Sequence, residues 1–103
     1  MTENSNGNPL DQAEKLLDQG TKAHDLGDFD VAIDLCTKAI DISPLIDAVA
    51  HYTRGLSYTG KGEYNLAIKD LDVAIVHGDG LSSIAQRERS KAVELKKRQG
   101  VNR

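Results

Sequence analysis

One segment of the sequence occurs twice, and this repetition constrains the fold more than any other feature. Residues 27–44, GDFDVAIDLCTKAIDISP, align without a gap with residues 62–79, GEYNLAIKDLDVAIVHGD. The offset is 35 residues throughout, and it places glycine on glycine, aromatic on aromatic and alanine on alanine. Self-similarity at a period of about 20–50 residues is typical of repeat architectures, in which each unit stacks on its neighbour.

The pattern of apolar residues predicts five helices, four with apolar residues at spacings of three and four and a last one that is only weakly amphipathic. The expected helices cover residues 10–26, 29–42, 45–60, 64–76 and 84–98. Gly27 is expected to take the left-handed conformation that ends a helix, and Asp28 to cap the next one. Pro44 should end the second helix, since the residue before a proline is disfavoured in the α region. Ser82 or Ser83 is expected to cap the last helix.

The composition indicates a core of aliphatic and small side chains, because the 103 residues include no tryptophan and one phenylalanine. The repeated alanines (Ala32, Ala39, Ala67 and Ala74) would let a neighbouring helix approach closely. Cys36 lies on the same apolar stripe, where a free cysteine behaves as a small hydrophobe.

The charges are unevenly distributed along the chain. Residues 1–80 contain 14 acidic and 6 basic residues, whereas residues 81–103 contain 2 acidic and 7 basic ones. A single cysteine cannot form an internal disulfide, which favours a reducing compartment. The N-terminal residues lack the pattern of a signal peptide, and no stretch approaches the roughly 20 apolar residues of a membrane span. We therefore expect a soluble, cytoplasmic protein.

These residues resemble the tetratricopeptide repeat (TPR) family, whose unit is a pair of antiparallel helices in about 34 residues. The matching positions are Gly20 and Gly55, the turns Gly27-Asp28-Phe29 and Gly62-Glu63-Tyr64, the four repeated alanines, Tyr58 and Pro44. The departures are Gln19 and Arg54 in place of leucine, Ala23 in place of tyrosine, Cys36 and Leu71 in place of an aromatic residue, and Asp79 in place of proline.

The resemblance implies an all-α fold of antiparallel helix-turn-helix repeats, a five-helix TPR-like α–α superhelix. Its domain would cover residues 10–98, with one repeat at 13–46, a second at 48–80 and a capping helix at 81–98. We expect a disordered leader at residues 1–9, because this stretch is polar and lacks apolar periodicity. A flexible tail is expected at residues 99–103.

The same resemblance implies a concave groove, lined by the first helix of each repeat, that binds a peptide segment or helix of a partner protein. Carried onto this chain, the groove positions are Leu17, Asp18, Thr21, His24, Val49, Tyr52, Thr53, Leu56, Arg87 and Lys91. Tyr52 is the strongest candidate anchor, because aromatic residues dominate binding hot spots. Packing of Tyr52 between helices is an equally open interpretation.

Some members of the family hold the terminal carboxylate of a chaperone tail with a clamp of lysine, asparagine and arginine. Leu17, Thr21 and Thr53 occupy the corresponding positions here and cannot supply it. Only Arg87 or Lys91 would contribute a cation. The sequence therefore predicts that this chain is not a tail adaptor of that type.

No catalytic or metal-binding pattern emerges from the sequence. His24, His51 and His77 lie on separate predicted helices, whereas a zinc site needs about four convergent ligands. Cys36 lacks the exposure and the neighbouring base of a nucleophile. We expect neither enzymatic activity nor a cofactor.

The functional hypothesis is a non-catalytic protein-protein interaction module, a scaffold or adaptor with a protein or peptide partner. One alternative is a homo-oligomeric scaffold, in which self-association follows from the acidic body and the basic C-terminal segment. Another is a binder of nucleic acid or an acidic surface through the basic C-terminal helix. The absence of aromatic residues from that helix disfavours nucleic acid.

Overall fold

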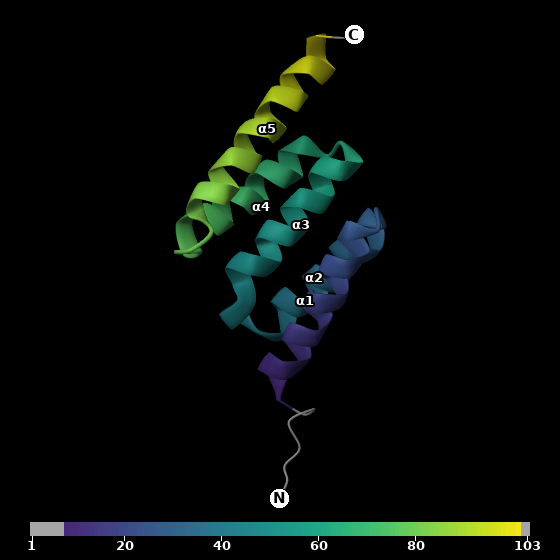
Figure 1. Cartoon of the computed structure of the whole chain (residues 1–103), viewed down its shortest axis with the longest axis vertical. Coiled ribbons are helices and arrows are strands. Elements are labelled where there is room, and N and C mark those ends of the chain that lie inside the picture. Colours follow the sequence, from purple (N-terminus) through teal and green to yellow (C-terminus); the bar gives the residue numbers. More distant parts are fainter. Residues whose placement is uncertain (1–7, 102–103) are drawn as a thin grey trace, which may run out of the picture.

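The computed structural model describes residues 8–101, which form an all-α fold with no strand among them (Figure 1). The five α-helices are α1 (Pro9–Asp25), α2 (Phe29–Ile42), α3 (Asp47–Lys61), α4 (Tyr64–His77) and α5 (Ser82–Val101). A short 3-10 turn, η2 (Pro44–Ile46), joins α2 to α3. The predicted fold class is confirmed. Within the described residues, none of the helices has the length and apolar character needed to cross a membrane.

The helices stack side by side in chain order along an elongated body, whose principal extents are 60, 27 and 18 Å (Figure 1). Helix α1 contacts α3, and α3 contacts α5, whereas within residues 8–101 α2 and α4 do not touch. The odd-numbered helices therefore lie closer to one another than the even-numbered helices do, and they form a row on one side of the stack.

The two ends of the described chain are more helical than the sequence predicted. Pro9 is the first residue of α1, and the Asn8 side chain caps the helix by accepting a hydrogen bond from the Leu10 backbone N–H at 2.8 Å. The predicted leader at residues 1–9 is therefore wrong at residues 8 and 9, and its remainder lies outside the described residues. Helix α5 continues through residues 99–101, so the predicted tail is wrong there, and residues 102–103 lie outside the description.

The predicted helix ends at Gly27 and before Pro44 are confirmed, whereas two predicted side-chain caps are not. Gly27 and Gly62 have φ values of 84° and 82°, in the left-handed region that favours glycine. Asp28 precedes α2, but its ψ of 70° differs from the extended conformation of a capping residue, and its side chain makes no capping bond. Ser82 is the first residue of α5, and its hydroxyl donates to the Ile75 carbonyl at 2.7 Å. It therefore ties α5 to the end of α4.

The helices of each repeat pack through small residues at equivalent positions. The four repeated alanines are completely buried. A Cβ added at Gly20 would lie 3.0 Å from Cys36 Sγ, and one added at Gly55 would lie 3.0 Å from Leu71 Cγ. These contacts are related by the same 35-residue offset, so the sequence repeat is also a repeat of packing.

Candidate functional site

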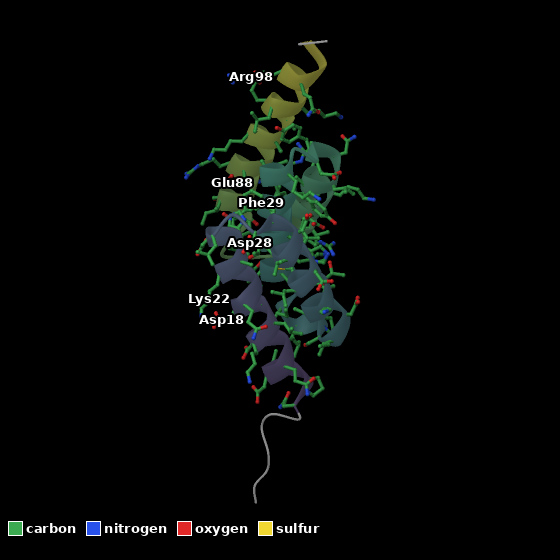
Figure 2. All side chains as sticks on the ribbon, turned by 90° about the vertical axis from the view of Figure 1, so that its right-hand side faces the viewer. Asp18, Lys22, Asp28, Phe29, Glu88 and Arg98 are labelled. Carbon is green, nitrogen blue, oxygen red and sulfur yellow. The ribbon has the colours of Figure 1, made fainter. Side chains whose placement is uncertain are left out.

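The row formed by α1, α3 and α5 carries all ten residues predicted to line a groove. Asp18, Thr21, Val49, Arg87 and Lys91 are exposed, Leu17, His24, Tyr52 and Leu56 are partly buried, and Thr53 is buried. Figure 2 shows Asp18 on α1, and Glu88 farther along the long axis on α5. The row thus leads from an acidic residue, past the apolar residues of α3, to the basic residues of α5.

Tyr52 is both a packing residue and a surface residue. Its ring packs against the core cluster of Leu71, Ala74 and Ala85, while part of the side chain stays accessible. Burial raises the pKa of Tyr52; nearby Glu88 also raises it, and Arg87 lowers it. The residue therefore lies where α3, α4 and α5 meet, beside charged groups of α5.

Two of the predicted groove residues serve the packing of the helices. Thr53 is only 6% exposed, so its prediction as a partner-contacting residue is wrong. It falls on the side of α3 that packs into the stack. His24 Nδ1 lies 3.1 Å from Ser57 Oγ, and its ring centroid lies 5.5 Å from that of Phe29. This histidine therefore joins α1 to α2 and α3.

Some polar side chains of the row are engaged locally. Thr21 Oγ1 donates to the Leu17 carbonyl at 3.0 Å, and Lys91 Nζ donates to Glu88 Oε2 at 3.4 Å across an exposed part of α5. An exposed pair of this kind contributes about 0–1 kcal/mol, so a ligand can displace it with little loss. Val49, which is 43% exposed, adds apolar surface near the start of α3.

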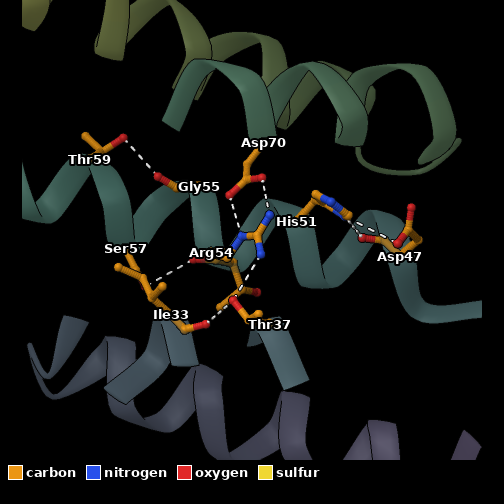
Figure 3. A network of polar contacts seen from close by, with 10 residues as sticks. Ile33, Thr37, Asp47, His51, Arg54, Gly55, Ser57, Thr59 and Asp70 are labelled. Carbon is orange, nitrogen blue, oxygen red and sulfur yellow. Dashed lines mark hydrogen bonds and ion pairs between the residues drawn. The ribbon is translucent and has the colours of Figure 1, made fainter. Parts of the chain in front are cut away.

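A polar network ties three helices together behind this row (Figure 3). Arg54 of α3 donates from Nε and Nη2 to the two carboxylate oxygens of Asp70 on α4, each at 2.8 Å. Its Nη1 donates to Thr37 Oγ1 of α2 at 3.0 Å. The hydrogen bonds with Asp70 raise the pKa of Arg54 above its ordinary value. The sequence marked Arg54 as unusual but gave no partner for it.

Sequence reasoning missed a hollow of about 580 Å³ on the outer side of the α4–α5 junction. Among its lining residues are Ile68 and Lys69 from α4 and Arg89, Val93, Lys96 and Lys97 from α5. A smaller hollow beside it shares Asn65 and Lys96, and its other lining residues include Glu63, Tyr64 and Leu66. A comparison of the two repeats by charge, position by position, would have drawn attention to Lys69.

The described residues include no cluster of three or more histidine, cysteine, aspartate or glutamate side chains able to hold a metal ion. Cys36 is fully buried, and burial raises the pKa of its thiol to about 11. At neutral pH the thiol is therefore protonated and shielded, which does not suit a nucleophile.

Comparison with known proteins shows sequence similarity to two Hsc70-interacting proteins. Over 66 residues the chain is 39% identical to Hsc70-interacting protein 1 and to Hsc70-interacting protein 2, both of Drosophila melanogaster. The matched segment covers 64% of this chain but only 17% of either relative, so the chain spans a small part of their length. The sequence matches no protein-family model and no solved structure.

Proposed function

We propose that this chain is a TPR-type, non-catalytic interaction module that binds a peptide segment or helix of a partner protein along α1, α3 and α5. The observation that carries this proposal is the row of closely spaced odd-numbered helices, which presents apolar side chains of α3 between acidic and basic ends. The equivalent packing at Gly20 and Gly55 supports the assignment of the repeat.

The names of the relatives make an Hsc70-type chaperone the first partner to test. The side chains of Leu17, Thr21 and Thr53 do not provide a carboxylate clamp, and Thr53 is buried. We therefore propose that the chaperone surface bound here is not its terminal carboxylate. The apolar part of the row, near Val49, Tyr52 and Leu56, would instead contact apolar side chains of another segment of the chaperone.

Calorimetric titration of the chain with a purified Hsc70-type chaperone tests this proposal. Val49→Asp should weaken binding at least about fivefold, because a charge would be placed at an apolar contact. Val31→Asp is the matched control, since Val31 on α2 is 51% exposed and lies off the row. Removing the C-terminal tail of the chaperone should leave the affinity unchanged.

Leu56→Ala and Tyr52→Ala should also weaken binding, with the helical circular dichroism retained. Tyr52→Ala removes a core contact as well, so its binding is measured at a temperature where thermal unfolding shows it to be folded. If Val49→Asp and Leu56→Ala bind like the wild type, the row is not the binding surface. If the chaperone does not bind the wild type, the proposed partner is wrong.

A homo-oligomeric scaffold remains the alternative function, because the acidic residues of α1 and the basic residues of α5 lie on different helices of the stack. Multi-angle light scattering separates the two functions. A monomer at high protein concentration and low salt excludes self-association through these charges.

A further inference from the structure

The hollow between α4 and α5 differs in charge from the equivalent junction one repeat earlier. At the α2–α3 junction, Lys61 forms an ion pair with Asp30. Thirty-five residues later, Lys96 takes the position of Lys61, but Asn65 takes the position of Asp30. The second junction therefore keeps the cation and lacks the carboxylate that pairs with it in the first.

A second substitution acts in the same direction. Asp34 of α2, which pairs with Lys38 at 3.1 Å, corresponds to Lys69 of α4. The α4–α5 hollow is therefore lined by Lys69, Arg89, Lys96 and Lys97, and no acidic residue lines it. Arg89 Nε donates to Asp72 Oδ1 at 2.6 Å. In the part of the chain that the structure describes, the three lysines have no acidic partner.

The floor of the hollow is apolar and lies between two helices. Ile68 and Val93 line it from α4 and α5, and Val93 takes the position that the larger Tyr58 occupies on α3. An apolar groove between two helices accepts the ridge of side chains of a third helix. The combination of this floor with unpaired cations points to a ligand that is both apolar and acidic.

The preceding repeat shows what packs on such a helix face. Arg89 is the equivalent of Arg54, which contacts Thr37 of the preceding α2 on one side and Asp70 of the following α4 on the other. Arg89 has the first of these contacts, with Asp72 at the position of Thr37. The second of these contacts has no counterpart at Arg89 within residues 8–101.

We propose that this hollow binds an acidic amphipathic helix of a partner protein. The apolar side chains of that helix pack on Ile68 and Val93, and its carboxylates face Arg89 and the three lysines. The hollow shares helix α5 with the row, but none of the ten predicted groove residues lines it. The proposal therefore does not rest on the function assigned to that row.

A pair of synthetic peptides tests the proposal by fluorescence anisotropy. The probe is a fluorescein-labelled helix of about four turns, with leucines at i, i+3, i+4 and i+7 and glutamates at the flanking positions. Its twin has glutamine at every glutamate position, which changes the charge but hardly changes the helix propensity. The wild-type chain should bind the glutamate probe at least about tenfold more tightly than the twin, and added salt should reduce the difference.

Asn65→Asp/Lys69→Asp gives the second junction the two carboxylates of the first, Asp30 and Asp34, and it should weaken binding of the glutamate probe about tenfold. Lys96→Glu/Lys97→Glu should weaken it similarly. Asn65, Lys69, Lys96 and Lys97 are all exposed, so circular dichroism should show both variants folded. The matched control is Lys15→Glu/Lys22→Glu on α1, which reverses two exposed charges away from the hollow and should bind like the wild type.

Three results would overturn the proposal. The first is equal binding of the two peptides, and the second is an equal loss in the α1 control variant. The third is binding of anionic lipid vesicles or single-stranded RNA that depends on Lys96 and Lys97 while neither peptide binds. Val49→Asp should leave probe binding unchanged, which separates a failure here from a failure of the proposed function.

Discussion

The two repeats have the same arrangement of helices but fill it with different chemistry. In the first repeat, Gly20 of α1 faces the small thiol of Cys36, and in the second, Gly55 of α3 faces the larger Leu71. Both facing side chains are completely buried. The small residue on the first helix is thus the common requirement, and its partner can vary in volume.

A larger contrast involves the positions beside these glycines. Gln19 and Leu35 in the first repeat correspond to Arg54 and Asp70 in the second. Gln19 is exposed and Leu35 is partly buried, whereas Arg54 and Asp70 form a bidentate ion pair with side chains 19% and 7% exposed. An inner repeat, with helices on both sides, can surround an ion pair with partners, and Thr37 of the first repeat supplies one of them.

The largest expected effect comes from breaking this ion pair. Asp70→Ala should lower the free energy of unfolding by about 3–5 kcal/mol, because it leaves a mostly buried guanidinium without its counterion. Urea denaturation followed by circular dichroism measures the loss.

The matched control transfers the residues of the first repeat. Arg54→Gln/Asp70→Leu should cost less than about 1.5 kcal/mol, since no unpaired charge remains. If this double variant is as unstable as Asp70→Ala, then the ion pair itself, rather than the stranded charge, stabilises the second repeat.

An effect on the order of 1–2 kcal/mol is expected at alkaline pH from the thiol of the first repeat. Burial raises the pKa of the Cys36 thiol from 9.0 to about 11, and Leu71 at the equivalent position cannot ionise. Between these pH values the unfolded chain loses the thiol proton while the folded chain keeps it. The free energy of unfolding should therefore fall as the pH rises from about 9 to 11.

Cys36→Ala should show a shallower decline over the same range, and the difference between the two profiles isolates the thiol. Parallel profiles for the wild type and Cys36→Ala would show that the thiol ionises equally in the folded and unfolded chains. Chemical denaturation at a series of pH values provides the measurement.

The smallest effects concern how the first helix of each repeat begins. Asn8 caps α1 through a 2.8 Å bond, whereas Ser43 accepts from the Leu45 N–H at 3.3 Å ahead of α3. Asn8→Ala should destabilise by about 1 kcal/mol, and Ser43→Ala by about 0.5 kcal/mol, because a longer bond is weaker. Thermal unfolding of both variants compares them, and a larger loss from Ser43→Ala would contradict the ranking.

The sequence predicted most of the fold because local signals and the repeat agree. The bounds of α2 match the prediction, and Gly27 has the expected left-handed conformation. The wrong predictions concern residues that are compatible with more than one local structure. Asn8 and Pro9 were assigned to the predicted leader, but Asn8 caps α1 and Pro9 begins it. Ser82 had carbonyl acceptors at the end of α4 that a sequence does not reveal.

The candidate binding surface was less predictable, because residues on one helix face differ in burial. Thr53 follows Tyr52 directly, yet it is turned into the stack while part of Tyr52 stays accessible. The partner of Arg54 lies 16 residues away on another helix, so helical periodicity could not identify it. The α4–α5 hollow is lined by Val93, which is smaller than Tyr58 at the equivalent position of α3. This difference in size indicates a hollow only when the packing of the helices is known.

Helix α3 is the one described helix that contacts all four others, and its contacts have a consequence for folding kinetics. Almost every helix-helix contact joins neighbours in the chain, so the mean sequence separation of contacts is low and folding should be fast. Opening of α1 or α5 leaves α3 still covered by the remaining helices. Backbone amides of α3 should therefore exchange with solvent most slowly, and those near Pro9 and Gly100 first.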